Sequence, residues 1–415
     1  MTTRARGALM ATLLLLAARH AAAQPVRLRA DALTAAETPV GLLNLSAEAD
    51  VTPWLSAQAA VWLGASSAGS GLDPVDDGAG EALIINLEAR AADGRAAAKL
   101  GRMVAMVGAL RPLHLDGAWA RASLPWRLQL EAFGGAPVAP GMRARSFDWL
   151  VGGRVGRRVG DFGSVGVAYL HQRDHGERAT EELALDAGAA LGEHGDAAAR
   201  LTLDLIRVGL AEVQLTTARR WGRWRVEAFA SERHASHLLP ATSLFSVIGD
   251  LGAQRAGAVV AVRAAPRLDV TGALGGRRVD DDLSAEATLR ARLYLGDRRA
   301  ARSRDRRAAA TPAIGVLGLE LRRQGADLDG WTGARATGWL PVGGVAGGAV
   351  SAAAEVELVI PDHDERGAAW PWGLAALTWT RARWEAAVAL EASATPQLSS
   401  RVDVLARLAR RWEAP

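Results

Sequence analysis

The sequence predicts an all-β protein that forms a single transmembrane antiparallel β-barrel with an even number of strands. Three observations support this prediction. Apolar and polar residues alternate one by one through most of the chain. The alternating stretches are joined by connections that are short and long in turn. The first residues have the composition of an export signal.

The alternation is clearest in residues 284–295, S-A-E-A-T-L-R-A-R-L-Y-L. Side chains along a strand point alternately to opposite faces, so this segment has one face of Ala and Leu and one polar face. The same pattern occurs around residues 83–90, 126–133, 200–205, 223–230 and 383–391. A helix would need apolar residues three and four apart, and that spacing places Leu201, Leu203 and Leu205 on no common face. We therefore predict strands with one apolar and one polar face.

The connections between these stretches indicate the strand number. The longer connections are predicted around residues 65–80, 134–147, 172–180, 232–256, 276–283, 324–330 and 361–367. Short turns lie between them, for example at Pro53, at Pro125, at Ala265-Pro266 and from Pro341 to Gly344. Counting on this basis gives about 22 strands, within an accepted range of roughly 16 to 22.

A soluble β-sandwich would also alternate, but it would rarely hold so many strands. The chain has only five Phe and two Tyr, and many apolar positions are Ala, a face better suited to lipid than to a packed core. Several of the 14 Trp stand beside predicted turns, where an aromatic girdle at a membrane surface belongs. These are Trp54, Trp126, Trp221 and Trp339.

The N-terminus predicts a cleaved signal peptide over residues 1–23, followed by the barrel over residues 24–415. Arg4 and Arg6 precede a short apolar stretch, and Ala21-Ala22-Ala23 offers a cleavage site. The apolar stretch is too short for a membrane-spanning helix, which needs ~20 residues.

Charge and cysteine content exclude several classes of function. The net charge is +4, from 49 basic and 45 acidic residues. Three of the basic residues, Arg4, Arg6 and Arg19, lie in the predicted signal, which leaves 46 basic against 45 acidic, or +1. A nucleic-acid partner therefore lacks electrostatic support. The chain has no cysteine, so disulfides and thiolate sites are excluded.

The last predicted strand carries an apolar face formed by Val402, Val404, Leu408 and Trp412. This face resembles the terminal strand by which the barrel-assembly machinery recognises Gram-negative outer-membrane proteins, although Arg410 interrupts it and three residues follow Trp412. Over nearly its whole length the chain resembles porin-like outer-membrane β-barrels in general, and no specific family. The resemblance implies an outer-membrane location, contact with membrane lipid and insertion by that machinery.

The predicted inward faces carry charges of both signs, and these residues are the candidates for lining a lumen. They are Arg200, Asp204, Arg223, Arg225, Glu227, Glu286, Arg290 and Arg292. Such residues either line a water-filled pore or pair across strands to stabilise the wall, and both alternatives stay open. We expect passive diffusion of small hydrophilic solutes or ions. The alternative is a non-conducting barrel with a structural or partner-binding role through its outer loops.

No enzyme chemistry, cofactor or metal is expected. His171 and His175 lie four apart on a strand that runs into a connection, which is not a helical ligand pair. The acidic run Asp280-Asp281-Asp282 fits no calcium-binding loop. We expect no catalytic residues, and the sequence does not indicate an oligomeric state.

Overall fold

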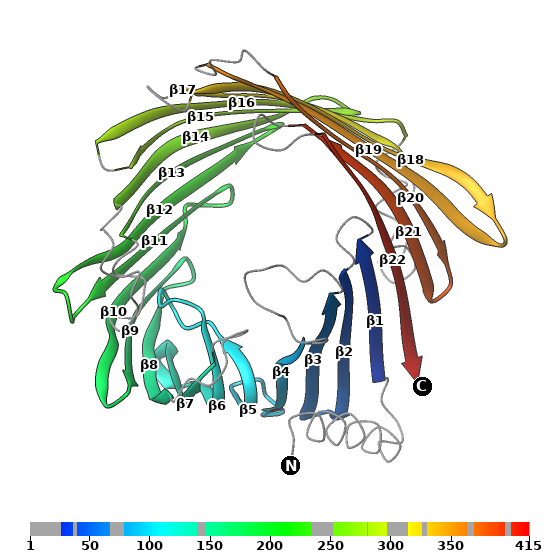
Figure 1. The fold of residues 1–415 in the computed structure, drawn as a ribbon. Coiled ribbons are helices and arrows are strands. Elements are labelled where there is room, and N and C mark those ends of the chain that lie inside the picture. The colour runs from blue at the N-terminus through cyan, green and yellow to red at the C-terminus, as the bar shows by residue number, and fades with distance from the viewer. Residues whose placement is uncertain are drawn as a thin grey trace.

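In the computed structural model, 22 strands form one closed antiparallel sheet (Figure 1). The structure describes residues 26–35, 40–66, 79–138, 147–234, 252–279, 281–296, 314–325, 330–362, 369–394 and 400–414. Each strand pairs with the next along the chain, and β1 pairs with β22. The prediction of a β-barrel with an even number of strands is confirmed. The observed number of strands, 22, lies at the upper end of the predicted range.

The elements are β1 (Val26–Ala35), β2 (Val40–Thr52), β3 (Leu55–Ser66), β4 (Ala79–Arg90), β5 (Ala96–Ala105), β6 (Leu113–Ser123), the 3-10 turn η1 (Pro125–Arg127), β7 (Leu128–Pro137), β8 (Phe147–Val159), β9 (Gly163–Asp174), β10 (Glu177–Ala190), β11 (Gly195–Asp204), β12 (Gly209–Trp221), β13 (Trp224–His234), β14 (Gly252–Ala265), β15 (Leu268–Val279), β16 (Asp282–Tyr294), β17 (Val316–Gly325), β18 (Trp331–Val345), β19 (Gly348–Pro361), β20 (Trp370–Arg381), β21 (Trp384–Ser393) and β22 (Arg401–Ala414). Among the described residues, no helix is long and apolar enough to cross a membrane.

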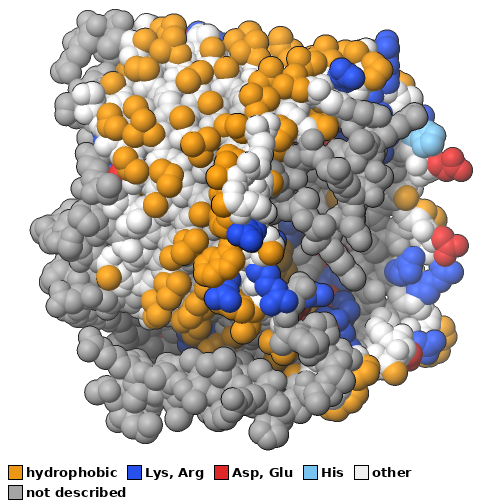
Figure 2. Space-filling model, turned by 90° about the vertical axis from the view of Figure 1, so that its right-hand side faces the viewer, with side chains coloured by type: hydrophobic (Ala, Val, Ile, Leu, Met, Phe, Trp, Pro, Cys, Tyr) orange, Lys and Arg blue, Asp and Glu red, His pale blue; other side chains and the backbone are white. Residues whose placement is uncertain are grey.

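The alternation in β16 sets the two faces of the wall. Leu289 lies opposite Gly272 of β15 and Leu321 of β17, whereas Arg290 lies opposite Thr271 and Glu320. Residues that face each other across antiparallel strands share one face of the sheet, so leucines extend along the outer face and charges along the inner face. Leu289 and Leu321 are about half exposed, at 51% and 47%. Figure 2 shows hydrophobic side chains spread over one side of the outer wall, with acidic side chains mainly towards one edge. Such a surface suits lipid.

Three of the predicted connections are wrong. The long connection expected at residues 276–283 is only two residues long, because β15 ends at Val279 and β16 begins at Asp282. The long connection expected at residues 172–180 is a two-residue turn at His175 and Gly176, which both have positive φ (53° and 79°). Tight hairpins favour such dihedrals, and a sequence count based on polarity does not detect them. The turn expected from Pro341 to Gly344 lies inside β18, where a bulge between Pro341 and Gly343 lets the strand continue to a turn at residues 346–347.

Three of the four tryptophans predicted for a girdle flank short turns. Trp54 and Trp126 are exposed in such turns, and Trp221 ends β12 opposite Trp224. Trp339 is different, because it pairs with Val316 and Ala353 within β18 and shares the inner face with Glu320 and Arg335. The girdle assignment of Trp339 is therefore wrong. The predicted signal peptide, residues 1–23, lies outside the described residues.

Candidate functional site on the inner face of the barrel

The inner face is organised as ion pairs that connect strands beyond their immediate neighbours. Glu320 of β17 pairs with Arg290 of β16 and, at 3.1 Å, with Nε of Arg322 on its own strand. Nη2 of Arg322 lies 2.7 Å from Oε1 of Glu357 on β19. The chain of charges thus connects β16, β17 and β19 and spans β18, which lies between the last two.

A second group of inner-face charges is centred on Arg154 of β8. Its Nε and Nη2 donate to the two carboxylate oxygens of Asp186 on β10, at 2.8 and 2.6 Å. Its Nη1 also lies 3.4 Å from Oε1 of Glu131 on β7. The Arg154 side chain is only 9% exposed, so this fork of charge-assisted hydrogen bonds is largely shielded from water.

Close to the Arg154 group, a short segment folds against the inner face. Residues 106–112 connect β5 to β6, and Val107, Ala109 and Leu110 within them are almost fully buried. Their side chains join an apolar cluster with residues of the surrounding strands, including Phe133, Leu150 and Leu170. Burying a side chain such as Leu110 stabilises this arrangement by roughly 1.5–3 kcal/mol. We call residues 106–112 the inner segment.

Polar contacts fix the inner segment to strands far along the chain. The carbonyl oxygen of Gly108 accepts a hydrogen bond from Nη2 of Arg200 at 2.9 Å. The carbonyl oxygen of Ala109 accepts one from Oγ1 of Thr202, also at 2.9 Å. Arg111 pairs with Glu182 of β10, whose side chain is only 1% exposed. The segment therefore extends from β5 and β6 to β10 and β11 across the inner face.

Gly108 is required at the point where the inner segment meets the Arg154 group. Its φ is +56°, a conformation that side chains rarely adopt. A Cβ at this position would lie 2.5 Å from Oδ1 of Asp186 and 2.8 Å from Cδ of Arg154. A larger residue here would therefore force the side chain of Asp186 or Arg154 to move.

The structure divides the eight candidate inward residues into separate groups. Arg200 binds the inner segment, and Asp204 accepts hydrogen bonds from the backbone N–H groups of Ile206 and Arg207 in the turn after β11. Arg225 pairs with Glu227, and Arg223 lies in the preceding turn with its guanidinium 6.0 Å from the ring centroid of Trp224. Glu286 pairs with Arg255, Arg290 joins the β16–β19 chain of charges, and Arg292 lies opposite Asp269 and Gly318.

Sequence reasoning missed the inner segment, including Arg111, and the partner of Arg111 on β10, Glu182. One signal was available, because residues 103–110, M-V-A-M-V-G-A-L, break the alternation with a continuous apolar run. The contacts themselves could not be predicted, since they join residues 71 to 93 positions apart.

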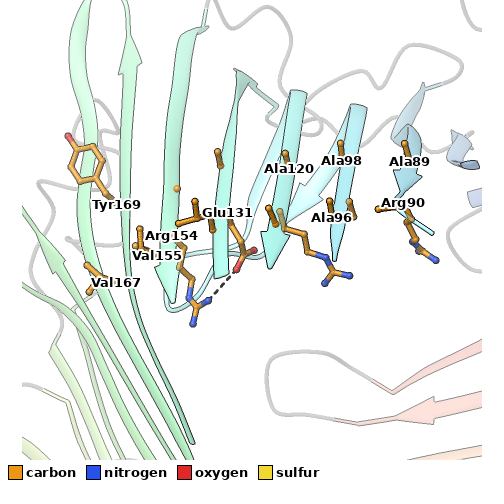
Figure 3. A pocket seen from close by; sticks show the side chains of 18 residues that line it. Ala89, Arg90, Ala96, Ala98, Ala120, Glu131, Arg154, Val155, Val167 and Tyr169 are labelled. Carbon is orange, nitrogen blue, oxygen red and sulfur yellow. Dashed lines mark hydrogen bonds and ion pairs between the residues drawn. The ribbon is translucent and has the colours of Figure 1, made fainter. Parts of the chain in front are cut away.

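The wall also carries a groove on its outer face, of about 920 Å³ across β4 to β9. Its floor is formed by small residues in register, such as Ala89, Ala98 and Ala120. Figure 3 shows these alanines on one side of their strands, while the side chains of Glu131 and Arg154 extend to the other. The groove is thus separate from the inner-face charges.

The predicted assembly strand is β22, which closes the barrel against β1. Val402, Val404 and Leu408 are exposed on the outer face, at 58%, 42% and 48%, and Trp412 shares that face. Arg410 lies among them, as the sequence indicated.

Fold and inner face together define a class: the closed antiparallel β-barrels with an apolar outer face and a charged inner face, which are typical of transmembrane barrels. No protein-family model matches the sequence, and no curated protein matches it significantly. Among solved structures, the chain is similar to the translocation pore of the P pilus usher PapC, with a TM-score of 0.53, 10% identity, and coverage of 94% of this chain and 100% of that one.

A second similar structure is PapC in an E. coli P pilus tip assembly intermediate, with a TM-score of 0.56, 9% identity, and coverage of 93% of this chain and 60% of that one. Pseudomonas aeruginosa OpdK with vanillate gives a lower TM-score of 0.38, at 12% identity, and covers 94% of this chain and 98% of that one. At these identities the likeness is one of fold, and it rests on the two usher structures.

Proposed function

We propose that the protein is a porin-like channel of the outer membrane, through which small hydrophilic solutes or ions diffuse passively. The single observation behind this proposal is a closed 22-stranded wall with charged side chains along its inner face and leucines along its outer face. A polar interior is typical of barrels that enclose water, and an apolar exterior is typical of contact with lipid.

In this proposal the eight candidate residues line or stabilise the lumen, and the inner segment narrows it on the side of β5 to β11. Arg290 and Glu286 each pair with an opposite charge, which favours weak rather than strong ion selectivity. Outer-membrane location, removal of residues 1–23 and insertion by the barrel-assembly machinery through β22 belong to the same proposal.

Liposome swelling with sugars of increasing size tests solute passage. Liposomes that contain the protein are expected to swell in small sugars and to stop swelling above a size limit. Folded protein that gives no swelling with any sugar would contradict the proposal. That result would favour the alternative, a non-conducting barrel with a structural or partner-binding role through its outer loops.

A further inference from the structure

Arginine and tryptophan alternate across the outer face at one end of β20, β21 and β22. Arg381, the last residue of β20, lies directly opposite Trp384, the first residue of β21. Trp384 in turn lies opposite Arg410 of β22. Neighbouring strands are about 4.8 Å apart, so the backbones of the two arginines flank Trp384 at roughly 10 Å from each other.

Two indole rings hold the guanidinium of Arg410. Its Cζ lies 4.6 Å from the ring centroid of Trp384 and 4.8 Å from that of Trp412. Both distances are within the range of cation–π interactions, which orient the cation but leave its charge uncompensated. Nε of Arg410 is buried without a hydrogen-bond partner.

The acidic residue nearest to Trp384 in sequence, Glu385, forms its ion pairs on the inner face. Glu385 pairs with Arg407 at 2.8 Å and with Arg411 at 3.6 Å. The outer-face positions next to the arginine–tryptophan row are apolar: Trp379, Ala386 and Leu408. Among the described residues, no carboxylate forms an ion pair with Arg410.

Another outer-face arginine shows how the chain can neutralise such a charge itself. Arg102 lies opposite Asp116 on the outer face and donates two hydrogen bonds of 2.7 Å to its carboxylate. Arg410 has two aromatic rings where Arg102 has a carboxylate. Among the described side chains no carboxylate neutralises Arg410, so an anion from the surroundings of the barrel can act as its counter-ion.

We propose that Arg410, between Trp384 and Trp412 and beside Arg381, binds the phosphate of an anionic phospholipid in the leaflet next to the short turns. The planar guanidinium forms paired hydrogen bonds with phosphate oxygens, and arginine suits this role better than lysine. The tryptophans hold the guanidinium at the level of the headgroups, where indole rings prefer to lie. The two-residue turn after Arg381, at residues 382–383, puts the row at the end of the wall.

The site depends on the barrel lying in a membrane, but not on solute passage. A failure of this proposal is therefore distinguishable from a failure of the proposed channel, which is measured by swelling or conductance.

Native mass spectrometry of the full protein from mixed phosphatidylglycerol and phosphatidylcholine nanodiscs tests the site. The wild type is expected to retain at least one phosphatidylglycerol preferentially, Arg410→Gln to lose that preference, and Arg410→Lys to keep part of it. Arg157→Gln is the matched control, since Arg157 is an exposed outer-face arginine opposite Leu128 and Val165 near another short turn. The control is expected to behave as the wild type.

A melting-temperature series keeps the test independent of mass spectrometry. Added phosphatidylglycerol should raise the melting temperature of the wild type by several degrees more than that of Arg410→Gln, and Arg410→Leu should fold in pure phosphatidylcholine. Equal retention of both lipids by the wild type, or equal loss in Arg157→Gln and Arg410→Gln, would overturn the proposal. So would Arg410-dependent binding of inorganic phosphate alone, because it would assign the site to a soluble anion.

Discussion

Arg407 of β22 pairs with Asp31 of β1, 376 residues earlier in the chain, with Nη2 2.7 Å from Oδ1. Nη1 of the same guanidinium lies 2.8 Å from Glu385 of β21. Arg29 adds a further bond to Asp31, from Nε to Oδ2 at 2.5 Å. One side chain therefore connects three strands across the junction where the first and last strands meet. Among the strands that the structure describes, this junction is the only pairing between strands distant in sequence.

Removing this side chain should weaken closure. Arg407→Gln leaves Asp31 and Glu385 without their shared partner, and we expect a loss of about 1–3 kcal/mol in the free energy of unfolding. Heat-dependent migration on SDS gels measures it as a lower unfolding temperature. Arg27→Gln is the control, because its 3.9 Å pair with Glu48 is more than half exposed and should contribute less than about 1 kcal/mol. Equal losses in both variants would contradict a special role for Arg407.

The pair of Arg111 and Glu182 should hold the inner segment in place. Arg111→Ala leaves a buried carboxylate without its cation, at an expected cost of about 3–5 kcal/mol. The inner segment should then detach, and its cleavage by an added protease should accelerate. The double variant Arg111→Met with Glu182→Leu should recover much of the stability, since no buried charge is left. If the double variant is less stable than Arg111→Ala, the explanation is wrong.

Gly108→Ala should disturb the inner segment by direct contact. The new methyl group would overlap Asp186 and Arg154, whose hydrogen bonds would have to break or shift. Gly94→Ala is a matched control, because Gly94 has a similar φ of +71° and nothing within 4 Å of the added Cβ. Both variants carry backbone strain of about 1 kcal/mol. The excess loss in thermal stability of Gly108→Ala therefore measures the contact, and no excess would show that the contact is unimportant.

Ion selectivity should respond to the chain of charges from β16 to β19. Arg290→Gln removes one cation and leaves Glu320 with Arg322 alone. If these residues line a conducting lumen, the reversal potential in a salt gradient should shift towards cation selectivity. The shift in reversal potential should be smaller at high salt, because dissolved ions screen exposed charges. The screening length is only about 3 Å at 1 M salt. An unchanged reversal potential would place the permeation path away from this part of the wall.

Much of the fold follows from the sequence because strand alternation is a local property. The parity of residues 284–295 assigns Leu289 to the outer face and Arg290 to the inner face, and the structure agrees. Turn conformation is harder to predict from the sequence than strand alternation. His175 and Gly176 form a tight hairpin turn where a longer connection was expected.

The candidate site was less predictable than the fold. Alternation indicates which face a side chain occupies but not which charge it meets two strands away, as with Arg322 and Glu357. The contacts of the inner segment depend on the curvature of the closed wall, which brings Thr202 to the carbonyl oxygen of Ala109. No local pattern in the sequence encodes that approach.

Conductance of the purified protein in planar bilayers tests the central claim most directly. We predict stepwise conductance increases in the wild type, and larger steps in Arg111→Ala, because release of the inner segment widens the lumen. Folded wild-type protein, verified by its heat-dependent gel migration, that gives no conductance steps at any voltage or salt concentration would contradict the account of a channel.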